Sequence, residues 1–326
     1  MSDNKCPAMS VILSTADNYE SIRATVRHLR AQNVVNQIEL VIIAPSASAL
    51  NLADDELKSF CRYVVLEGGP GQSVGLANAL GVRHATAPVI ALAEDHAFPA
   101  PGWAEALIAA HREPWAAVGP VVRNANPKSM LSRADLVISY GPWMDPAPAG
   151  FVDYLPGHNT SYKRELLLGY GADLDSMMEG ETSLHWDLRS KGHKLYLEPA
   201  AKIAHMNFAV LVPFMQVHWY GGRGFATTRA QNANWGWGKR LFFSCASPLI
   251  PAVRLWRILR EMGRHGRSRA PVLRVLPQIL IGLVADATGQ MLGYTLGAGQ
   301  TTAKLTRLEH HRYRYASRSA YRAHRR

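Results

Sequence analysis

Two acidic residues and a histidine directly follow a short apolar run in the first third of the chain. The apolar run is VIALA (89–93), the polar group is Glu94, Asp95 and His96, and PAPGW (99–103) comes next. This order predicts a buried strand that ends in an acidic loop, followed by a turn and the start of a helix. Carboxylate oxygens are ligands for Mg²⁺ or Mn²⁺, and such an ion can hold a diphosphate. The alternative is an acidic turn that only caps the next helix.

A second pair of carboxylates lies near residue 180, after a polar turn. Within the segment GETSLHWDLRSKG (180–192), residues 183–191 predict a helix, and Glu179 and Glu181 precede this helix. A carboxylate at this place can take a proton from a hydroxyl nucleophile, or it can simply interact with the helix dipole. The polar turn has His158 and Asn159 at its centre, so hydrogen-bonding side chains gather there in a short space.

The elements that must position these residues alternate between strand and helix over the first 120 residues. Apolar runs predict five strands, separated by segments of helical spacing, at 9–14, 38–44, 62–66, 89–93 and 116–122. This alternation is typical of a largely parallel sheet with helices on both faces, whose strands end at one shared edge. Because Thr15 and Asp17 follow the first strand, we expect them at the same edge as Glu94 and Asp95. An ordinary polar loop after a strand is the alternative for Thr15 and Asp17.

Composition narrows the class of protein. The chain has 326 residues, of which 48% are hydrophobic, so it can bury a sizeable core. Its three cysteines are far apart and form neither a disulfide framework nor a zinc-binding pattern, which fits a reducing cytoplasm. The N-terminal residues lack the pattern of a secretory signal. We therefore expect a cytoplasmic protein.

The last third of the chain differs from the rest in charge and in aromatic content. The formal charge is +11, and arginines are concentrated from Arg254 to Arg326. Trp219 and Tyr220 lie among basic residues, as in a membrane-surface belt. The segments 241–258 and 273–296 have apolar helical faces with basic borders, which suits a peripheral helix on anionic lipid. A helical cap or a homo-oligomer interface is the alternative.

Five segments, in this order, resemble the family 2 glycosyltransferases, which have the GT-A fold, over residues 9 to 207. They are SVILSTADNYESI, VIALAEDHAFPAPGW, PGHNTSYKRELL, GETSLHWDLRSKG and LEPAAKIAHMN. The resemblance implies an α/β fold with a GT-A-like (Rossmann-like), mostly parallel central sheet covered by helices, plus a C-terminal helical region. We accordingly expect a nucleotide-sugar domain at 1–207 and a basic, amphipathic helical region at 208–326.

The resemblance also implies an activity. Family 2 enzymes move a sugar from a nucleotide-diphosphate sugar to an acceptor hydroxyl with inversion, and some bacterial members build surface polysaccharide at the cytoplasmic face of the membrane. We expect this chemistry here, with a glycan or a lipid-linked acceptor and an anionic membrane surface as partners. The enzyme is then peripheral on the inner face of the cell membrane.

The resemblance assigns the metal ligands and the base. Asp95 is expected to bind a divalent cation, Mn²⁺ or Mg²⁺, with Glu94 and His205 as further ligands. The family usually has two carboxylates flanking one residue, and Ala93 stands at the first of these positions as we align them. Glu181 is expected to be the general base, with Glu179 as the second choice.

The substrate contacts are assigned next. Thr15, Asp17, Asn78, Asp95 and Arg223 are placed on the donor side, and contact with an anionic lipid-linked acceptor is the alternative for Arg223. The acceptor side is given to His158, Asn159 and Trp186, for which a polar turn and ordinary helix packing are the alternatives.

Two other classes of function are weighed against this one. Ala93, together with Ala44 at the end of the second strand, prompts a catalytically silent GT-A-like scaffold. The basic C-terminal tail prompts a nucleic-acid-binding protein. The chain shows no sequence signature of a common nucleic-acid-binding domain, so we expect no nucleic-acid partner.

Overall fold

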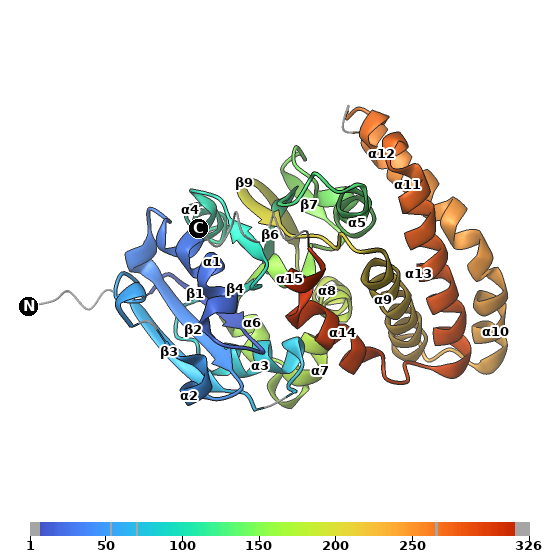
Figure 1. Cartoon of the computed structure of the whole chain (residues 1–326). Helices are drawn as coiled ribbons and strands as arrows, with labels where there is room; N and C mark the ends of the chain where they lie inside the picture. The colour runs from blue at the N-terminus through green and yellow to red at the C-terminus, as the bar shows by residue number, and fades with distance from the viewer. Residues whose placement is uncertain (1–6, 53, 70, 265–266, 317–326) are drawn as a thin grey trace, which may run out of the picture. The chain divides into compact units, whose positions relative to one another are not determined.

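The structure is a computed structural model that describes residues 7–52, 54–69, 71–264 and 267–316. The chain forms two compact units, which we describe separately (Figure 1). The first unit holds the described residues up to Arg123 together with Asp145–His205. The second holds Asn124–Met144 and the described residues from Met206 onward. Residues 124–144, which we expected within the first domain, therefore pack with the C-terminal helices.

One mixed sheet organises the first unit. Its strand order is β3-β2-β1-β4-β8-β6-β9-β5, and β7 pairs with β9 beside this path. The strands are β1 (Met9–Ser14), β2 (Ile38–Ala44), β3 (Arg62–Glu67), β4 (Val89–Ala93), β5 (Ala97–Pro99), β6 (Ala117–Asn124), β7 (Gly150–Val152), β8 (Ser161–Lys163) and β9 (Leu195–His205). Strands β1 to β4 pair with one another in parallel, as the alternation predicts.

The register of the sheet brings separate loops to one place. The parallel pairs Ser14↔Ile43 and Leu13↔Ala93 put the ends of β1, β2 and β4 at the same edge. β8 runs antiparallel to β4, so that the turn before Ser161 lies beside the end of β4. At the other side, β5 pairs antiparallel with β9, and His205 stands opposite Ala97. Residues that are more than 100 positions apart in sequence therefore meet after β4.

Strand β9 is continuous, although the spacing around Pro199 predicts two short strands. Leu195 and Leu197 pair with β7, whereas Ile203 and His205 pair with β5. Pro199 falls between these two pairings, and neither of them needs the N–H that proline lacks.

Helices cover the sheet, and capping side chains mark the starts of two of them. Asn18 accepts a hydrogen bond from the Glu20 amide at the start of α1, and Ser73 caps α3 in the same way. The core between helices and sheet is built from apolar side chains such as those of Leu13, Leu40 and Trp103. The helices of this unit are α1 (Tyr19–Arg30), α2 (Ala47–Leu50), α3 (Val74–His84), α4 (Trp103–Ala110), α6 (Arg164–Leu168), α7 (Leu174–Glu179) and α8 (Glu181–Ser190).

The second unit is helical. Its elements are α5 (Met130–Tyr140), α9 (Leu211–Asn232), α10 (Trp237–Ala246), α11 (Ile250–Arg264), α12 (Ala270–Arg274), α13 (Leu276–Leu296), α14 (Thr301–His310) and α15 (Arg312–Tyr315). Helices α9 and α13 pack closely because glycines meet backbone across them. A Cβ on Gly289 would overlap the carbonyl oxygen of Trp219, and one on Gly293 would overlap that of Arg223.

A buried carboxylate explains why α5 belongs to this unit. Asp135 Oδ1 lies 3.1 Å from His218 Nε2, and its Oδ2 accepts a hydrogen bond of 2.9 Å from the Phe208 amide. Arg312 approaches the same carboxylate at 3.6 Å. Burial raises the pKa of Asp135, but His218 and Arg312 outweigh it and hold that pKa below its usual value.

Two helical segments of this unit are long and apolar enough to cross a membrane, judged by length and composition alone. They are Trp237–Gly263, of which 11% of the most apolar window is buried, and Leu276–Leu296, of which 56% is buried. Core helices of soluble proteins can pass the same test, so this finding does not assign a span.

Candidate functional site

Three buried side chains converge at the end of β4. Glu94, His96 and His205 each offer a ligand atom, and these atoms all lie within 4.8 Å of one another. Glu94 Oε2 is 3.5 Å from His96 Nε2 and 3.4 Å from His205 Nε2. The two imidazole rings meet edge to face, with centroids 5.0 Å apart. The turn between β4 and β5 supplies the first two residues, and the last residue of β9 supplies the third.

Asp95 does not belong to this group of three. Its Oδ1 lies 2.6 Å from His96 Nδ1. A carboxylate on one imidazole nitrogen fixes the tautomer and the ring orientation, so that Nε2 is the atom directed at Glu94. Asp95 as the leading metal ligand stays a prediction; in the structure its carboxylate contacts His96, which was not among the predicted ligands. The available signal was the spacing, because Glu94 and His96 flank one residue as the family's two carboxylates do.

Asn159 also contacts the carboxylate of Glu94. Its Nδ2 donates a hydrogen bond of 3.0 Å to Glu94 Oε2. Its Oδ1 is buried and has no hydrogen-bond partner among the described residues. We expected Asn159 on the acceptor side, and the structure brings it to the proposed metal ligands. The side chain of His158 lies outside the part of the chain that the structure describes.

Hydrogen bonds also fix the backbone of the turn. Thr25 on α1 donates through Oγ1 to the carbonyl oxygens of Glu94 and Ala97, at 3.0 and 3.3 Å. The Leu92 amide donates to the Thr160 carbonyl at 3.1 Å. The loop that carries two of the three converging side chains is therefore tied to a helix and to the neighbouring turn.

The donor set fits a divalent metal ion. It consists of one carboxylate oxygen and two imidazole nitrogens. Asn159, which donates a hydrogen bond to Glu94, also has a buried amide oxygen. Imidazole suits Mn²⁺ better than Mg²⁺, which prefers oxygen ligands and water. Glu94 and His205 were predicted as ligands, and the structure brings both together.

Glu181 lies against the turn that contains Asn159. It is the first residue of α8, and a Cβ on Gly157 would overlap its carboxylate. Gly157 and Asn159 both belong to the three-residue turn η4 (Gly157–Asn159). One short turn therefore contacts Glu181 through Gly157 and Glu94 through Asn159.

A buried neutral pair lies beneath the first turns of α8. The Tyr162 hydroxyl and His185 Nε2 are 2.9 Å apart. Burial lowers the pKa of His185 to about 4, so this imidazole is neutral at pH 7 and can accept the hydroxyl proton of Tyr162. Burial also raises the pKa of Tyr162 well above its usual value, and the charge of Glu181 raises it further. Glu181 is thus close enough to Tyr162 to act on it electrostatically.

Glu179, our second choice for the base, has a structural partner. It accepts a hydrogen bond from Ser73 Oγ at the start of α3. A Cβ on Gly75 would lie 2.7 Å from Glu179 Cα, so the two segments pack backbone to backbone. This role favours Glu181 over Glu179.

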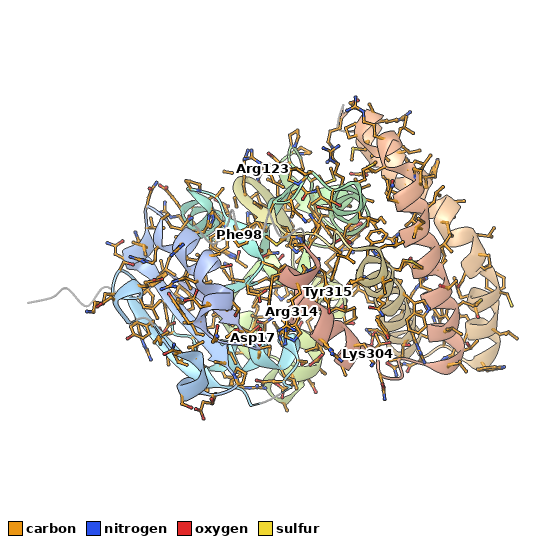
Figure 2. The ribbon with its side chains drawn as sticks, viewed as in Figure 1. Asp17, Phe98, Arg123, Lys304, Arg314 and Tyr315 are labelled. Carbon is orange, nitrogen blue, oxygen red and sulfur yellow. The ribbon has the colours of Figure 1, made fainter. Side chains whose placement is uncertain are left out.

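Apart from Asp95, the residues predicted for the donor side are found in three places. Thr15 follows β1, and its Oγ1 accepts from the Asp17 amide at 3.1 Å, the ordinary polar loop that we weighed as the alternative. Asp17 is labelled in Figure 2. Asn78 is buried on α3, and its Oδ1 has no hydrogen-bond partner among the described residues. Arg223 belongs to the second unit, where its Nε donates to the Gly297 carbonyl at 2.7 Å. Trp186, predicted for the acceptor side, is half-buried on α8.

Comparison with known proteins bears on the first unit. Residues 10–168 match the family described as Glycosyl transferase family 2. No curated protein matches the chain. The structure of GalNAc-T7 with UDP, GalNAc and Mn²⁺ has 13% identity and a TM-score of 0.47, covering 63% of this chain. The chain spans 44% of the length of that protein.

A second solved structure is similar over most of the chain. It is the mannosyltransferase PcManGT from Pyrobaculum calidifontis in complex with GDP-Man and Mn²⁺. The identity is 15% and the TM-score 0.54, with 88% of this chain and 87% of that one covered. The GT-A-like α/β fold expected from the resemblance is therefore confirmed.

Proposed function

We propose that the chain is a family 2 glycosyltransferase, which transfers a sugar, with inversion, from a nucleotide-diphosphate sugar to an acceptor hydroxyl. The observation that carries this proposal is the pair of groups joined by η4. On one side of the turn lies the Glu94, His96 and His205 cluster, and on the other lies Glu181. Inverting transfer needs both a group that stabilises the leaving diphosphate and a base for the acceptor.

We propose that Glu94, His96 and His205 hold Mn²⁺, the ion named with both similar structures. When bound, the ion supplies positive charge against the negative charge that develops on the leaving diphosphate. Asp95 keeps Nε2 of His96 directed at the site, and Asn159 keeps Glu94 Oε2 in place. Glu94 and His96 then take the places of the family's two carboxylates, so Ala93 does not indicate a silent scaffold.

We propose Glu181 as the general base. Its carboxylate takes the proton of the acceptor hydroxyl as that oxygen attacks the sugar carbon from the face opposite the diphosphate. Gly157 leaves room for the carboxylate, because any side chain at this position would overlap it. His185 is neutral at pH 7 and places no positive charge beside this helix turn.

We propose that the acceptor is a glycan or a lipid-linked glycan in surface polysaccharide synthesis, and that the enzyme binds the inner face of the cell membrane. Support comes from the second unit, where large apolar side chains are exposed, including those of Trp237, Phe242, Leu249 and Trp256. Arginines such as Arg257 and Arg260 share these helices. Exposed apolar side chains with basic neighbours favour anionic lipid. The basic tail from residue 317 lies outside the described residues.

Calorimetric titration tests the donor site. UDP and GDP are titrated into the full chain, each with and without Mn²⁺. We expect one nucleotide to bind only with Mn²⁺, and His96→Ala to abolish that dependence while the protein stays folded by circular dichroism. If neither nucleotide binds to the folded protein under any condition, the proposed activity is wrong.

A further inference from the structure

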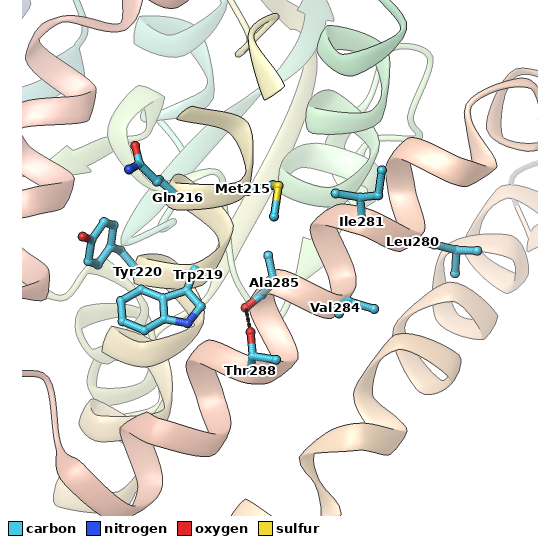
Figure 3. A pocket seen from close by; sticks show the side chains of 9 residues that line it. All are labelled: Met215, Gln216, Trp219, Tyr220, Leu280, Ile281, Val284, Ala285 and Thr288. Carbon is cyan, nitrogen blue, oxygen red and sulfur yellow. Dashed lines mark hydrogen bonds between the residues drawn. The ribbon is translucent and has the colours of Figure 1, made fainter. Parts of the chain in front are cut away.

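An apolar groove runs along the helical unit between α9 and α13 (Figure 3). Its volume is about 670 Å³, within the range of small-molecule sites. Among the side chains that line it are those of Met215, Trp219, Tyr220, Ile281, Val284 and Thr288. The groove lies entirely within the second unit, so it does not depend on how the two units are arranged.

The wall of the groove offers few groups that hydrogen bond. Thr288 Oγ1 donates to the Ala285 carbonyl at 2.8 Å, so its hydroxyl is satisfied inside α13. In Figure 3 the polar ends of Gln216 and Tyr220 point away from Val284. Val284 itself is 51% exposed. Such a surface can bind a hydrocarbon chain, whose methylenes need no polar partner.

Arg223 lies on α9, one turn after the groove residue Trp219. The Arg223 guanidinium lies 5.5 Å from the centre of the Trp219 ring, and its Nε donates to the Gly297 carbonyl just after α13. No carboxylate of a described residue forms an ion pair with Arg223. The guanidinium keeps further N–H donors beyond the one that Gly297 uses, and a phosphate is the group that such donors suit.

We propose that this groove binds the hydrocarbon chain of a lipid phosphate and that Arg223 pairs with the phosphate. An anionic amphiphile is favoured because its hydrocarbon chain matches the apolar wall of the groove. Its negative head group matches the charge of Arg223, for which the described residues provide no carboxylate partner. The large apolar side chains exposed on α10 and α11 extend the apolar surface of the same unit, which favours a lipid environment over a folded partner. The inference rests on the proposed function in one respect: it assigns the lipid part of the acceptor to this site.

Calorimetry with a matched set of probes tests the proposal. Monododecyl phosphate, below its critical micelle concentration, presents the chain and the anion together. Dodecyl maltoside presents the chain with an uncharged head group, and inorganic phosphate presents the anion alone. We expect the full chain to bind monododecyl phosphate at least about tenfold more tightly than dodecyl maltoside. Equal affinity for the two amphiphiles would remove Arg223 from the proposal.

Two substitutions locate the site. Val284→Trp fills the groove and should weaken monododecyl phosphate about tenfold or more, because methylenes lose their contacts. Val253→Trp is the matched control, since Val253 is 43% exposed on α11 and does not line the groove. Arg223→Gln should weaken monododecyl phosphate and leave dodecyl maltoside unchanged. Equal effects of the two tryptophans would overturn the assignment.

Two further measurements test whether a second copy of the chain fills the groove and whether the groove acts independently of the donor site. If sedimentation shows a dimer that Val284→Trp converts to a monomer, the groove is an interface between copies and the proposal is wrong. The nucleotide titrations are repeated on the two tryptophan variants, and we expect them to be unchanged. Nucleotide binding without monododecyl phosphate binding contradicts the groove alone, whereas the reverse contradicts the donor site alone.

Discussion

The two units of this chain carry candidate sites of opposite chemistry. In the first, charged and imidazole groups are buried: the side chains of Glu94, His96 and His205 are at most 6% exposed. In the second, large apolar groups are exposed, and Trp237 reaches 62%. Buried polar groups persist only when neighbours satisfy and orient them, and apolar surface persists outside only at some cost in solubility. We propose that each of these two places is where its unit meets a ligand.

The largest effect is expected when the proposed base, Glu181, is replaced. Glu181→Gln keeps the shape of the side chain but cannot accept a proton, so we expect kcat to fall by about a hundredfold to ten-thousandfold. Calorimetric affinity for nucleotide with Mn²⁺ should stay within about twofold, since Glu181 is not among the converging ligands. A variant as active as the parent would return Glu181 to a purely structural role.

A methyl group tests how the helical unit supports its exposed surface. Gly289→Ala would overlap the Trp219 carbonyl and force α9 and α13 apart, so we expect a loss of about 1–3 kcal/mol in unfolding free energy. Gly221→Ala is the control, because nothing lies within 4 Å of a Cβ there and alanine is the better helix former. Urea unfolding followed by helical circular dichroism measures both. Similar losses in the two variants would contradict the close packing of these helices.

Asp95 distinguishes a metal ligand from a residue that orients one. Because its carboxylate holds His96, Asp95→Ala should weaken Mn²⁺ binding by about tenfold to a hundredfold, the range for lost partners of ligating histidines. Glu94→Ala removes a ligand and should weaken it further. Electron paramagnetic resonance of free Mn²⁺ gives both affinities. An equal loss in the two variants would restore Asp95 as a direct ligand.

The smallest expected effect is a pH dependence of stability in the first unit. His185 has a pKa of about 4 in the folded chain and 6.5 as its ordinary value, so the unfolded chain binds the proton more readily. Its contribution is complete above pH 6.5 and is lost as the pH falls from 6.5 toward 4, by roughly 2 kcal/mol at pH 5. His185→Gln should reduce the fall in unfolding free energy between pH 7 and pH 5. His111, also with a pKa near 4, accounts for part of what remains.

Much of the first unit could be predicted because its signals are local. Apolar runs with intervening helical spacing give the parallel strands, and strand ends place Thr15 and Glu94 at one edge. The metal-like cluster depends instead on the antiparallel pairings of β4 with β8 and of β5 with β9, which no local pattern encodes. Asn159 was singled out by its polar neighbours, but its hydrogen bond to Glu94 could not be predicted from them. His96 was not selected because Asp95 has the expected chemistry. The tie between α5 and the helical unit depends on the long-range contacts of Asp135.

The hydrogen bonds around Glu94 have a thermodynamic consequence. Thr25, Asp95 and Asn159 restrain the backbone, one imidazole and the carboxylate without any bound ion. Little conformational entropy is then left to lose when a ligand arrives, and little apolar surface changes its exposure. Metal association at this site should therefore show a heat-capacity change close to zero, the signature of a rigid receptor and not of a loop that folds around its ion.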